Sequence, residues 1–370
     1  MSIQAGLVGL PNVGKSTLFN ALTKSSIPAE NYPFCTIDPH VAITTVPDER
    51  MAKLQQLFNS QKQIPATVTF VDIAGLVKGA ASGEGLGNQF LSHIQSVDLI
   101  LHVLRCFEDP DIIRTHELID PLDDYEVIVS ELMLKDLEIV SKRLEKMDRL
   151  LKLAQNKPAE LKELQQELHA LNQVKSALDQ TDAARVRDIA FAHPFKNAPL
   201  LTAKNYLIIS NVSENELEND AYTTNRYYQA LVARFGIKRV VPVCAKLEFE
   251  LAQLNDQEAL EMMSMLGIAN RGITEIIKKT YEHLGLITFF TCGPKEIHAW
   301  PIRKGITIRQ AAGEIHSDLE RGFICAEVYN YADLIALGSE SKLKEQGKLR
   351  IEGKDYIVQD GDIVHIRFNV

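Results

Sequence analysis

Five short runs of β-branched and aliphatic residues recur along the chain, and each is followed by turn residues and then by helical periodicity. Apolar strands that alternate with helices are typical of a mostly parallel sheet covered on both faces. Such sheets bind ligands at the carboxyl ends of their strands. The pattern therefore predicts an α/β domain with its functional residues just after the strands. The runs are residues 3–8, 67–72, 99–104, 206–210 and 239–244.

A different periodicity fills the interval between the third and fourth runs. Apolar residues alternate there at spacings of four and three, which predicts two long amphipathic helices. Residues 155–158 separate them, and Pro158 suits the first turn of a second helix, so an inserted antiparallel helical hairpin is expected. Two interpretations stay open, a plain structural insertion and an arm that binds a partner. The repeating residues are Met133, Leu137, Val140, Leu144, Met147 and Leu151, then Leu161, Leu164, Leu168, Leu171, Val174 and Leu178.

After a predicted helix at 273–284, the pattern changes to short strands punctuated by turn signals such as Glu352-Gly353. This pattern predicts a small α+β module. Its composition has no catalytic cluster, so binding is its expected role. The predicted strands are residues 287–291, 297–300, 323–328, 348–352, 357 and 363–368.

The length of 370 residues predicts two or three domains, at roughly 100 to 200 residues each. We expect the α/β domain at 1–125 and 200–282, interrupted by the hairpin at 126–199. The C-terminal module is expected at 283–370.

Composition narrows the class of protein. No window approaches the roughly 18 consecutive apolar residues of a membrane span, and the N-terminus lacks a basic-then-apolar signal, so we expect a cytoplasmic protein with no membrane partner. Five scattered cysteines without a C-x-x-C pair indicate neither a disulfide framework nor a zinc site. The net charge of -9 gives no overall attraction to nucleic acid. We therefore expect no DNA partner, a local basic surface if RNA is bound, and a monomer.

A phosphate-binding motif follows the first run. Residues 9–17 (GLPNVGKST) fit G-x-x-x-x-G-K-[ST] in its required place, between a strand and a helix. Glycines let backbone N–H groups point at the β-phosphate, the lysine neutralises β- and γ-phosphate charge, and the serine hydroxyl binds Mg²⁺. The expected nucleotide-binding residues are Gly9, Asn12, Val13, Gly14, Lys15, Ser16 and Thr17, with Lys15 also catalytic and Ser16 also a metal ligand.

Three further residues fit the same chemistry. Asp72 ends an apolar strand with a carboxylate that can hold Mg²⁺ directly or through water. Gly75 allows a backbone N–H to approach a γ-phosphate. Thr36 lies in a loop from which its hydroxyl could complete the Mg²⁺ shell when the γ-phosphate is present.

These residues, together with 76–90 (LVKGAASGEGLGNQF), resemble the Obg-related translation-factor GTPases, and in particular the YchF subfamily, the Obg-like ATPases. The resemblance covers essentially the whole chain, because that subfamily also has a helical hairpin inserted in its P-loop G domain and a C-terminal TGS (β-grasp) domain. It implies Mg²⁺-dependent hydrolysis of ATP in preference to GTP. It also implies ribosomes, ribosomal subunits or rRNA as partners.

The group that orients the attacking water is an open question. Many such GTPases place a glutamine directly after D-x-x-G, where this chain has Leu76, so slow intrinsic turnover is expected. Similar proteins tend to carry a histidine in the loop after the third strand, but this chain has Arg114 there and His116 two positions on. Both are catalytic candidates, and Arg114 could stabilise transition-state charge. His93 and His102 are other nearby polar groups, although His102 lies in an apolar strand and suits a core position.

Asn12 admits two interpretations. It resembles the asparagine of GTPases that use a bound K⁺ in place of an arginine finger, which would make K⁺ a second cofactor. A turn-favouring residue is the alternative.

The base-reading position holds Asn211-Val-Ser-Glu214 in place of the guanine-type Asn-Lys-x-Asp. Val212 lacks the lysine stem and charge, and Glu214 is one methylene longer than aspartate. In guanine, a carboxylate accepts from both N1–H and the exocyclic amine, whereas adenine presents one amine donor next to an acceptor. These residues favour ATP, with Asn211 offering its amide to the base. Ala245 and Lys246, after the fifth strand, complete the expected nucleotide-binding set.

Two classes of function follow from these residues. One is a switch protein that hydrolyses ATP, and an Obg-type GTPase is the alternative within this class. The other is a nucleotide-dependent RNA- or ribosome-binding module in which turnover is incidental. Lys342, Lys344, Lys348 and Arg350 form a modest basic stretch that is either an RNA contact or an ordinary solvated surface.

Overall fold

The computed structural model describes residues 3–24, 40–73, 86–109 and 119–369. Contacts divide the chain into two compact units. Among the described residues, the first unit contains 3–24, 40–42 and those of 70–273, and the second contains 43–69 and 274–369. The sequence placed 43–69 in the nucleotide-binding domain, whereas their contacts group them with the C-terminal module.

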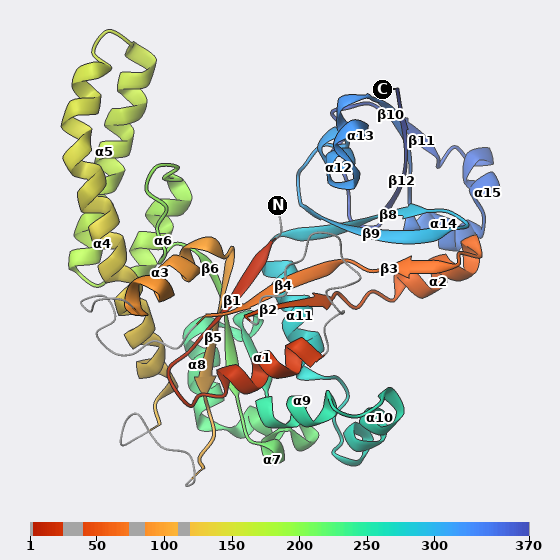
Figure 1. Ribbon diagram of the computed structural model, residues 1–370, viewed down its shortest axis with the longest axis horizontal. Helices are drawn as coiled ribbons and strands as arrows, with labels where there is room; N and C mark the ends of the chain where they lie inside the picture. Colours follow the sequence, from red (N-terminus) through yellow and green to blue (C-terminus); the bar gives the residue numbers. More distant parts are fainter. Residues whose placement is uncertain (1–2, 25–39, 74–85, 110–118, 370) are drawn as a thin grey trace. The chain divides into compact units, whose positions relative to one another are not determined.

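The first unit is built on a six-stranded sheet of order β2-β4-β1-β5-β6-β7 (Figure 1). Strand pairs β1–β5, β5–β6 and β6–β7 are parallel, as the apolar runs predict. Bonds from Val46 N to Ala66 O and from Asp72 N to His40 O show that β2 runs antiparallel to β4. The strands are β1 (Gln4–Val8), β2 (Val41–Thr45), β4 (Thr67–Asp72), β5 (Leu99–Arg105), β6 (Asn205–Asn211) and β7 (Val240–Val243).

Helices follow nearly every strand of this sheet. The sequence missed β2, α6 and α10, because short or mixed segments carry little periodicity. The helices of this unit are α1 (Lys15–Lys24), α3 (Leu86–Ser96), α4 (Pro121–Leu153), α5 (Pro158–Asp179), α6 (Ala183–Ala192), α7 (Glu214–Leu217), α8 (Arg226–Phe235), α9 (Ala245–Leu251) and α10 (Asp256–Met265), with short 3₁₀ turns at Glu218–Thr224 and Ile237–Arg239.

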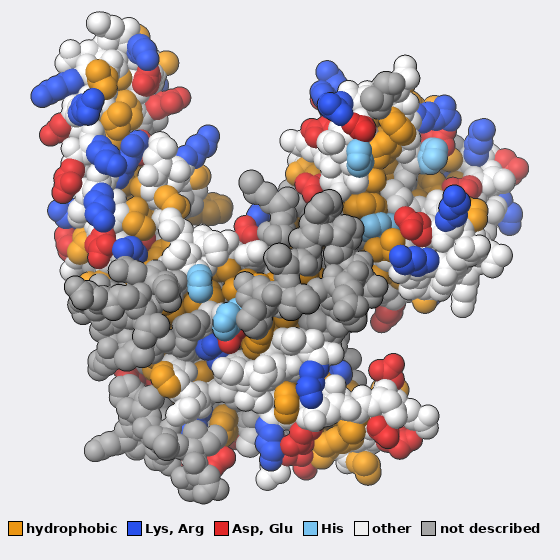
Figure 2. Space-filling view, in the orientation of Figure 1, with side chains coloured by type: hydrophobic (Ala, Val, Ile, Leu, Met, Phe, Trp, Pro, Cys, Tyr) orange, Lys and Arg blue, Asp and Glu red, His pale blue; other side chains and the backbone are white. Residues whose placement is uncertain are grey.

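The predicted helical hairpin is confirmed as α4 and α5, which lie side by side in Figure 1. Asp120 caps α4 by accepting from the backbone N–H groups of Leu122 and Asp123, and Pro158 opens α5. The inner face buries Val140, Met147, Leu171 and Val174 in one core cluster. Figure 2 shows both signs of charge along the outer surface of the hairpin.

The second unit holds the other sheet, of order β11-β10-β12-β8-β9-β3. Its core packs Ile308 and Ala311 of α12 against Phe289 and Val328 of the sheet. The predicted strand at 357 is a single bridge between Ile357 and Thr307. The elements are α2 (Arg50–Phe58), β3 (Lys62–Ile64), β8 (Leu286–Cys292), β9 (Glu296–Arg303), α12 (Ile308–Ile315), α13 (Ser317–Arg321), β10 (Phe323–Asn330), α14 (Tyr331–Leu337), α15 (Glu340–Glu345), β11 (Arg350–Glu352) and β12 (Asp362–Phe368). Helix α11 (Gly272–His283) begins in the first unit and continues in the second.

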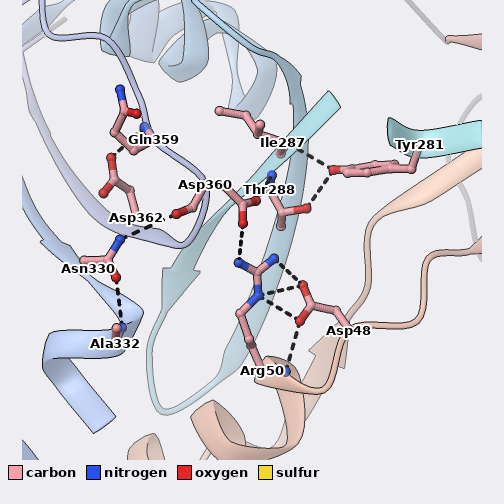
Figure 3. A network of polar contacts seen from close by, with 10 residues as sticks. All are labelled: Asp48, Arg50, Tyr281, Ile287, Thr288, Asn330, Ala332, Gln359, Asp360 and Asp362. Carbon is pink, nitrogen blue, oxygen red and sulfur yellow. Dashed lines mark hydrogen bonds and ion pairs between the residues drawn. The ribbon is translucent and has the colours of Figure 1, made fainter. Parts of the chain in front are cut away.

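Segments remote in sequence meet in this second unit. Strand β3 pairs in parallel with β9, so Lys62 lies opposite Glu296. Figure 3 shows the Arg50 guanidinium between Asp48 and Asp360, with distances of 2.7 and 2.8 Å to their carboxylate oxygens. Asp360 also accepts from the Thr288 N–H at 2.9 Å. These contacts hold residues 48–64 on the C-terminal sheet.

None of the helices in the described ranges is long and apolar enough to cross a membrane.

Candidate nucleotide-binding site

Strand β1 leads directly into the loop 9–14, and α1 begins at Lys15. A side chain at Gly9 would place its Cβ 2.8 Å from the Val103 carbonyl oxygen. Gly14 has a φ of 96°, and a Cβ there would lie 2.2 Å from Asn211 Nδ2. Only hydrogen fits at these two positions, which explains why the motif has glycine there.

Lys15 and Asp72 meet at the carboxyl edge of this sheet. Lys15 is 8% exposed, and its ammonium group forms an ion pair with the Asp72 carboxylate. β1 and β4 are neighbours in the sheet, so the two strand ends deliver the residues to one place. The amine predicted for phosphate and the carboxylate predicted for metal are therefore brought together.

The donor set suits Mg²⁺. Ser16 is exposed at the start of α1, and its hydroxyl and the Asp72 carboxylate are the hard oxygen ligands that Mg²⁺ prefers. Among the residues with described side chains, no group of three or more His, Cys, Asp or Glu could hold a metal. Mg²⁺ usually keeps several waters and shares substrate phosphates, so it needs no such group. Thr36, the third predicted ligand, lies outside the described residues.

Asn211 ties three loops together. Its Nδ2 donates to the Val13 carbonyl oxygen at 2.8 Å, and its Oδ1 accepts from the Ala245 N–H at 3.0 Å. One amide hydrogen and one oxygen lone pair are left by these bonds for a ligand. The sequence assigned Asn211 to the base, and this arrangement adds a positioning role that joins the phosphate loop to the loop after β7.

Val212 and Glu214 differ in where they point. The Val212 side chain is 1% exposed and packs in a core cluster, and its N–H donates to the Val243 carbonyl oxygen at 2.8 Å. Glu214 is the first residue of α7 and is half-buried. A buried valine cannot cover a base, so position 212 can contribute only through its backbone.

Sequence reasoning missed Glu216 and Asn225. Glu216 accepts from the Ser213 N–H and hydroxyl at 2.9 and 2.7 Å, and Asn225 Nδ2 donates to Glu216 at 2.6 Å and to the Cys106 carbonyl oxygen at 2.8 Å. The S-x-x-E spacing of Ser213 and Glu216 is a capping signal that could have identified the first of them. They line a cavity of about 340 Å³ after β5 and β6, together with Cys106, Phe107, Glu108, Ser213, Arg226 and Tyr227.

Buried Glu248 anchors the helix that starts at Ala245 and Lys246. Its carboxylate, 2% exposed, accepts from the Gly272 N–H at 2.5 Å and from Arg271 Nε at 3.2 Å. Burial raises the pKa of Glu248, although Arg271 opposes this effect. Ala245 is buried and Lys246 is exposed, so the latter side chain is free to lie over a ligand.

His102 is a core residue, as expected from its strand. It is 2% exposed and packs edge-on against Tyr125, with ring centroids 4.9 Å apart. Burial, reinforced by the charge of Arg187, lowers the pKa of His102 to about 3. It therefore stays neutral and serves packing. His93 lies exposed in the last turn of α3.

Asn12 has a φ of 63°, the left-handed conformation that asparagine tolerates in turns. This conformation fits the turn interpretation of Asn12, and K⁺ beside it stays a prediction. The remaining predicted residues of the site, Gly75, Leu76, Arg114 and His116, lie outside the described residues.

Comparisons with known proteins agree with this geometry. A family model described as "50S ribosome-binding GTPase" matches residues 4–143, and the model YchF-GTPase_C, described as "Protein of unknown function (DUF933)", matches residues 286–369. The "Ribosome-binding ATPase YchF" of Bacillus subtilis (strain 168) is 46% identical over 372 residues, covering 100% of both chains. Its namesake from Escherichia coli O157:H7 is 43% identical over 372 residues with the same coverage. The chain belongs to the YchF family.

A solved structure supports the YchF fold over the full length. The structure described as "Structure of the Schizosaccharomyces pombe YchF GTPase" aligns with a TM-score of 0.85 at 36% identity, covering 99% of this chain and 98% of that chain. The predicted fold class, a P-loop G domain with a hairpin insertion and a C-terminal module, is thereby confirmed. YchF membership also confirms the resemblance drawn from residues 9–17 and 72–90.

Proposed function

We propose that this protein is an Mg²⁺-dependent ATPase that binds ribosomes or ribosomal subunits and uses ATP hydrolysis to ADP and phosphate as a switch. The observation that carries the proposal is the convergence of Lys15, Asp72 and Asn211 at one sheet edge. That edge joins a phosphate loop to base-reading loops. The names of the YchF relatives support both the ATPase and the ribosome-binding parts.

Each residue has a definite task in this mechanism. Backbone N–H groups of the phosphate loop and Lys15 bind the β- and γ-phosphates and stabilise charge that develops on them. Ser16 and Asp72 would hold Mg²⁺, which supplies further charge neutralisation when bound. The approach of the Gly75 N–H to the γ-phosphate remains a prediction, as do Arg114 and His116 as catalytic residues. Thr36 as a metal ligand and K⁺ beside Asn12 also remain predictions.

The preference for ATP follows from position 212. Guanine-type sites use a lysine stem at this position, and here the side chain is buried in the core. Glu214 is half-buried at the start of α7, and it lacks the lysine that accompanies the aspartate of guanine-type sites. A substitution of lysine at 212 would have to expel its charge from the core, so Glu214 is the safer position to test.

The experiment is a titration of ATP and GTP into the wild type, E214D and the exposed control N215D. Tighter ATP binding in the wild type, with a shift toward GTP only in E214D, supports the proposal. A wild type that prefers GTP would instead favour the Obg-type GTPase. If ribosomal subunits neither bind the protein nor change its rate of ATP hydrolysis, the result would favour a binding module in which turnover is incidental.

The residues that would contact the ribosome are less clearly indicated than those that would bind ATP. Lys342 and Lys344 are exposed on α15, whereas Lys348 lies 3.3 Å from Asp333 and Arg350 lies 3.6 Å from Glu352. Acidic neighbours therefore offset the positive charge of Lys348 and Arg350, and Lys342 and Lys344 remain as the candidate RNA contacts. Their role in RNA binding is testable by K342E with K344E, which should weaken ribosome binding and leave ATP affinity unchanged.

A further inference from the structure

A buried carboxylate lies near the base of the helical hairpin. Asp136 of α4 is 0% exposed and occupies a core position between Met133 and Val140. Its Oδ1 accepts from the Leu201 N–H at 2.7 Å, and its Oδ2 accepts from the Thr202 N–H at 2.8 Å. Burial of a charge is costly and an apolar residue would pack more cheaply, so this aspartate indicates a positioning role.

The segment that Asp136 holds, residues 200–204, is a junction, and we call it the anchor segment. The Thr202 carbonyl oxygen accepts from Arg187 Nε of α6 at 3.0 Å. Lys204 Nζ donates to the carbonyl oxygens of Gln95 and Val97, at 2.9 and 2.5 Å, and so caps the end of α3. The labels of α3, α4, α6 and β6 lie together at the base of the hairpin in Figure 1.

Two site-bearing strands begin at this junction. Strand β6 starts at Asn205, directly after Lys204, and ends at Asn211. Strand β1 starts at Gln4, which exchanges backbone and side-chain bonds with Asp98 at 2.8 and 3.0 Å. Asp98 directly follows Val97, the residue that Lys204 holds. The anchor segment therefore reaches the amino ends of both strands whose carboxyl ends carry the nucleotide site.

We propose that Asp136 is a positioning residue that couples the helical hairpin, through the anchor segment, to β1 and β6 and so to the nucleotide site. Beyond Asp136, α4 continues to Leu153 over about 25 Å and acts as a lever. A partner that displaces the hairpin thus shifts the phosphate loop and Asn211. This inference rests on the proposed function and adds the regulation of its site.

The charges around Asp136 make this coupling depend on pH. Burial raises the pKa of Asp136 to about 6, opposed by bonds from Thr202 and Leu201 and by the charge of Lys204. The other ionisable groups at the junction are Lys204, Asp98, Arg187, Tyr125 and His102. Burial raises the pKa of Tyr125 to about 12 and lowers that of His102 to about 3. Neither Tyr125 nor His102 therefore changes charge near pH 6, whereas Asp136 does. Its protonation replaces an acceptor with an O–H donor facing an N–H, which weakens the tether.

The first test is hydrogen exchange of the full chain without ribosomes, in the wild type, D136N and E145Q. The asparagine keeps the shape but turns its NH₂ group toward a backbone N–H, so one buried bond to a charged group is lost. We expect about tenfold faster exchange at 201–202, in the last turn of α3 and at the starts of β1 and β6. Glu145 is exposed on the same helix, and E145Q should match the wild type. Faster exchange confined to 201–202 would overturn the inference.

The second test compares ATP hydrolysis with and without ribosomes. D136N should keep basal hydrolysis within about twofold yet lose about tenfold of the ribosome-dependent change. K204M removes the bonds to α3 and keeps the bonds from Leu201 and Thr202 to Asp136, so it should act in the same direction. It provides the test if D136N does not fold. Equal losses of basal and ribosome-dependent rates would make Asp136 merely structural and overturn the inference.

A pH series separates this inference from the proposed function. The ribosome-dependent change in the wild type should fall as pH drops through about 6, and D136N should show no such step. A step that persists in D136N contradicts the assignment to Asp136. Ribosomes that leave wild-type hydrolysis unchanged at every pH would remove the ribosome from the proposed function, while the exchange data would still decide the coupling.

Discussion

The two units each contain a six-stranded sheet, but they use polar contacts for different purposes. In the first, Lys15, Asp72 and Asn211 join strand ends to the loops that carry the chemistry. In the second, Arg50 joins segments that are 310 positions apart in sequence and touches no predicted site residue. Polar contacts of the first kind should control activity, and those of the second kind should control stability alone.

Lys15→Ala should produce the largest effect. The substitution removes the positive charge at the phosphates, and the loss of one such preorganised group lowers hydrolysis by about 10² to 10³. The free energy of unfolding should change little, because Asp72 keeps some contact with water. Steady-state hydrolysis and thermal unfolding measure the two effects. Asn20→Ala, exposed on the same helix, is the control, and equal rates in both variants would refute the assignment.

Asn211→Ala should affect activity and stability together. The variant leaves the Val13 carbonyl oxygen and the Ala245 N–H without their buried partner, at a cost of about 2 to 4 kcal/mol in unfolding free energy. ATP affinity should fall by about tenfold or more because the two loops lose their common anchor. Calorimetric titration and denaturant unfolding provide both numbers. Asn215→Ala on the exposed face of α7 should change neither, and an Asn211 variant that binds ATP normally would limit this residue to stability.

The first sheet was largely predictable because its signals are local. Strands β1, β4, β5, β6 and β7 each coincide with an apolar run of the sequence, and residues 9–17 carry a motif with a fixed mechanical role. The hairpin followed from the spacing of Val140, Met147 and Leu171, which the structure buries together. For these elements, the residues that are apolar in the sequence are the ones that the structure buries.

The remainder was unpredictable because it depends on pairing across the chain. Strand β3 contains only Lys62, Gln63 and Ile64, and nothing local indicates that it pairs with residues 296–298. Asp136 reads as a polar residue on an amphipathic helix, although its partners lie 65 and 66 positions away. The sequence showed that Val212 stands where guanine-type sites have lysine, but it could not show that this side chain is buried in the core.

Arg50→Met should change stability without changing activity. Arg50 bonds to Asp48 and Asp360 and lies 4.9 Å from the centre of the Phe290 ring, but half of the Asp360 side chain is exposed, so solvent screens that pair. We expect a loss of about 1 to 2 kcal/mol. Trp300 of β9 is the single tryptophan of the chain, so its fluorescence reports unfolding of this unit.

Lys53→Met, exposed on the same helix, is the matched control for Arg50→Met. ATP hydrolysis in both variants should stay within about twofold of the wild type, since neither residue belongs to the first unit. A large drop in hydrolysis for Arg50→Met alone would break the distinction between the units. It would mean that the second unit also sets the geometry of the nucleotide site.

Ser60→Ala should give the smallest effect and the sharpest view of how β3 is held. Ser60 is 7% exposed, and its hydroxyl donates to the Gly293 carbonyl oxygen in the turn between β8 and β9. The neighbouring bond from Gln61 N to Pro294 O, at 3.2 Å, survives the substitution, so only about 1 kcal/mol should be lost. Trp300 fluorescence during denaturant unfolding measures the loss, with exposed Gln56→Ala as the control. A loss several times larger would mean that this hydroxyl, and not the β3–β9 ladder, attaches residues 60–64 to the second sheet.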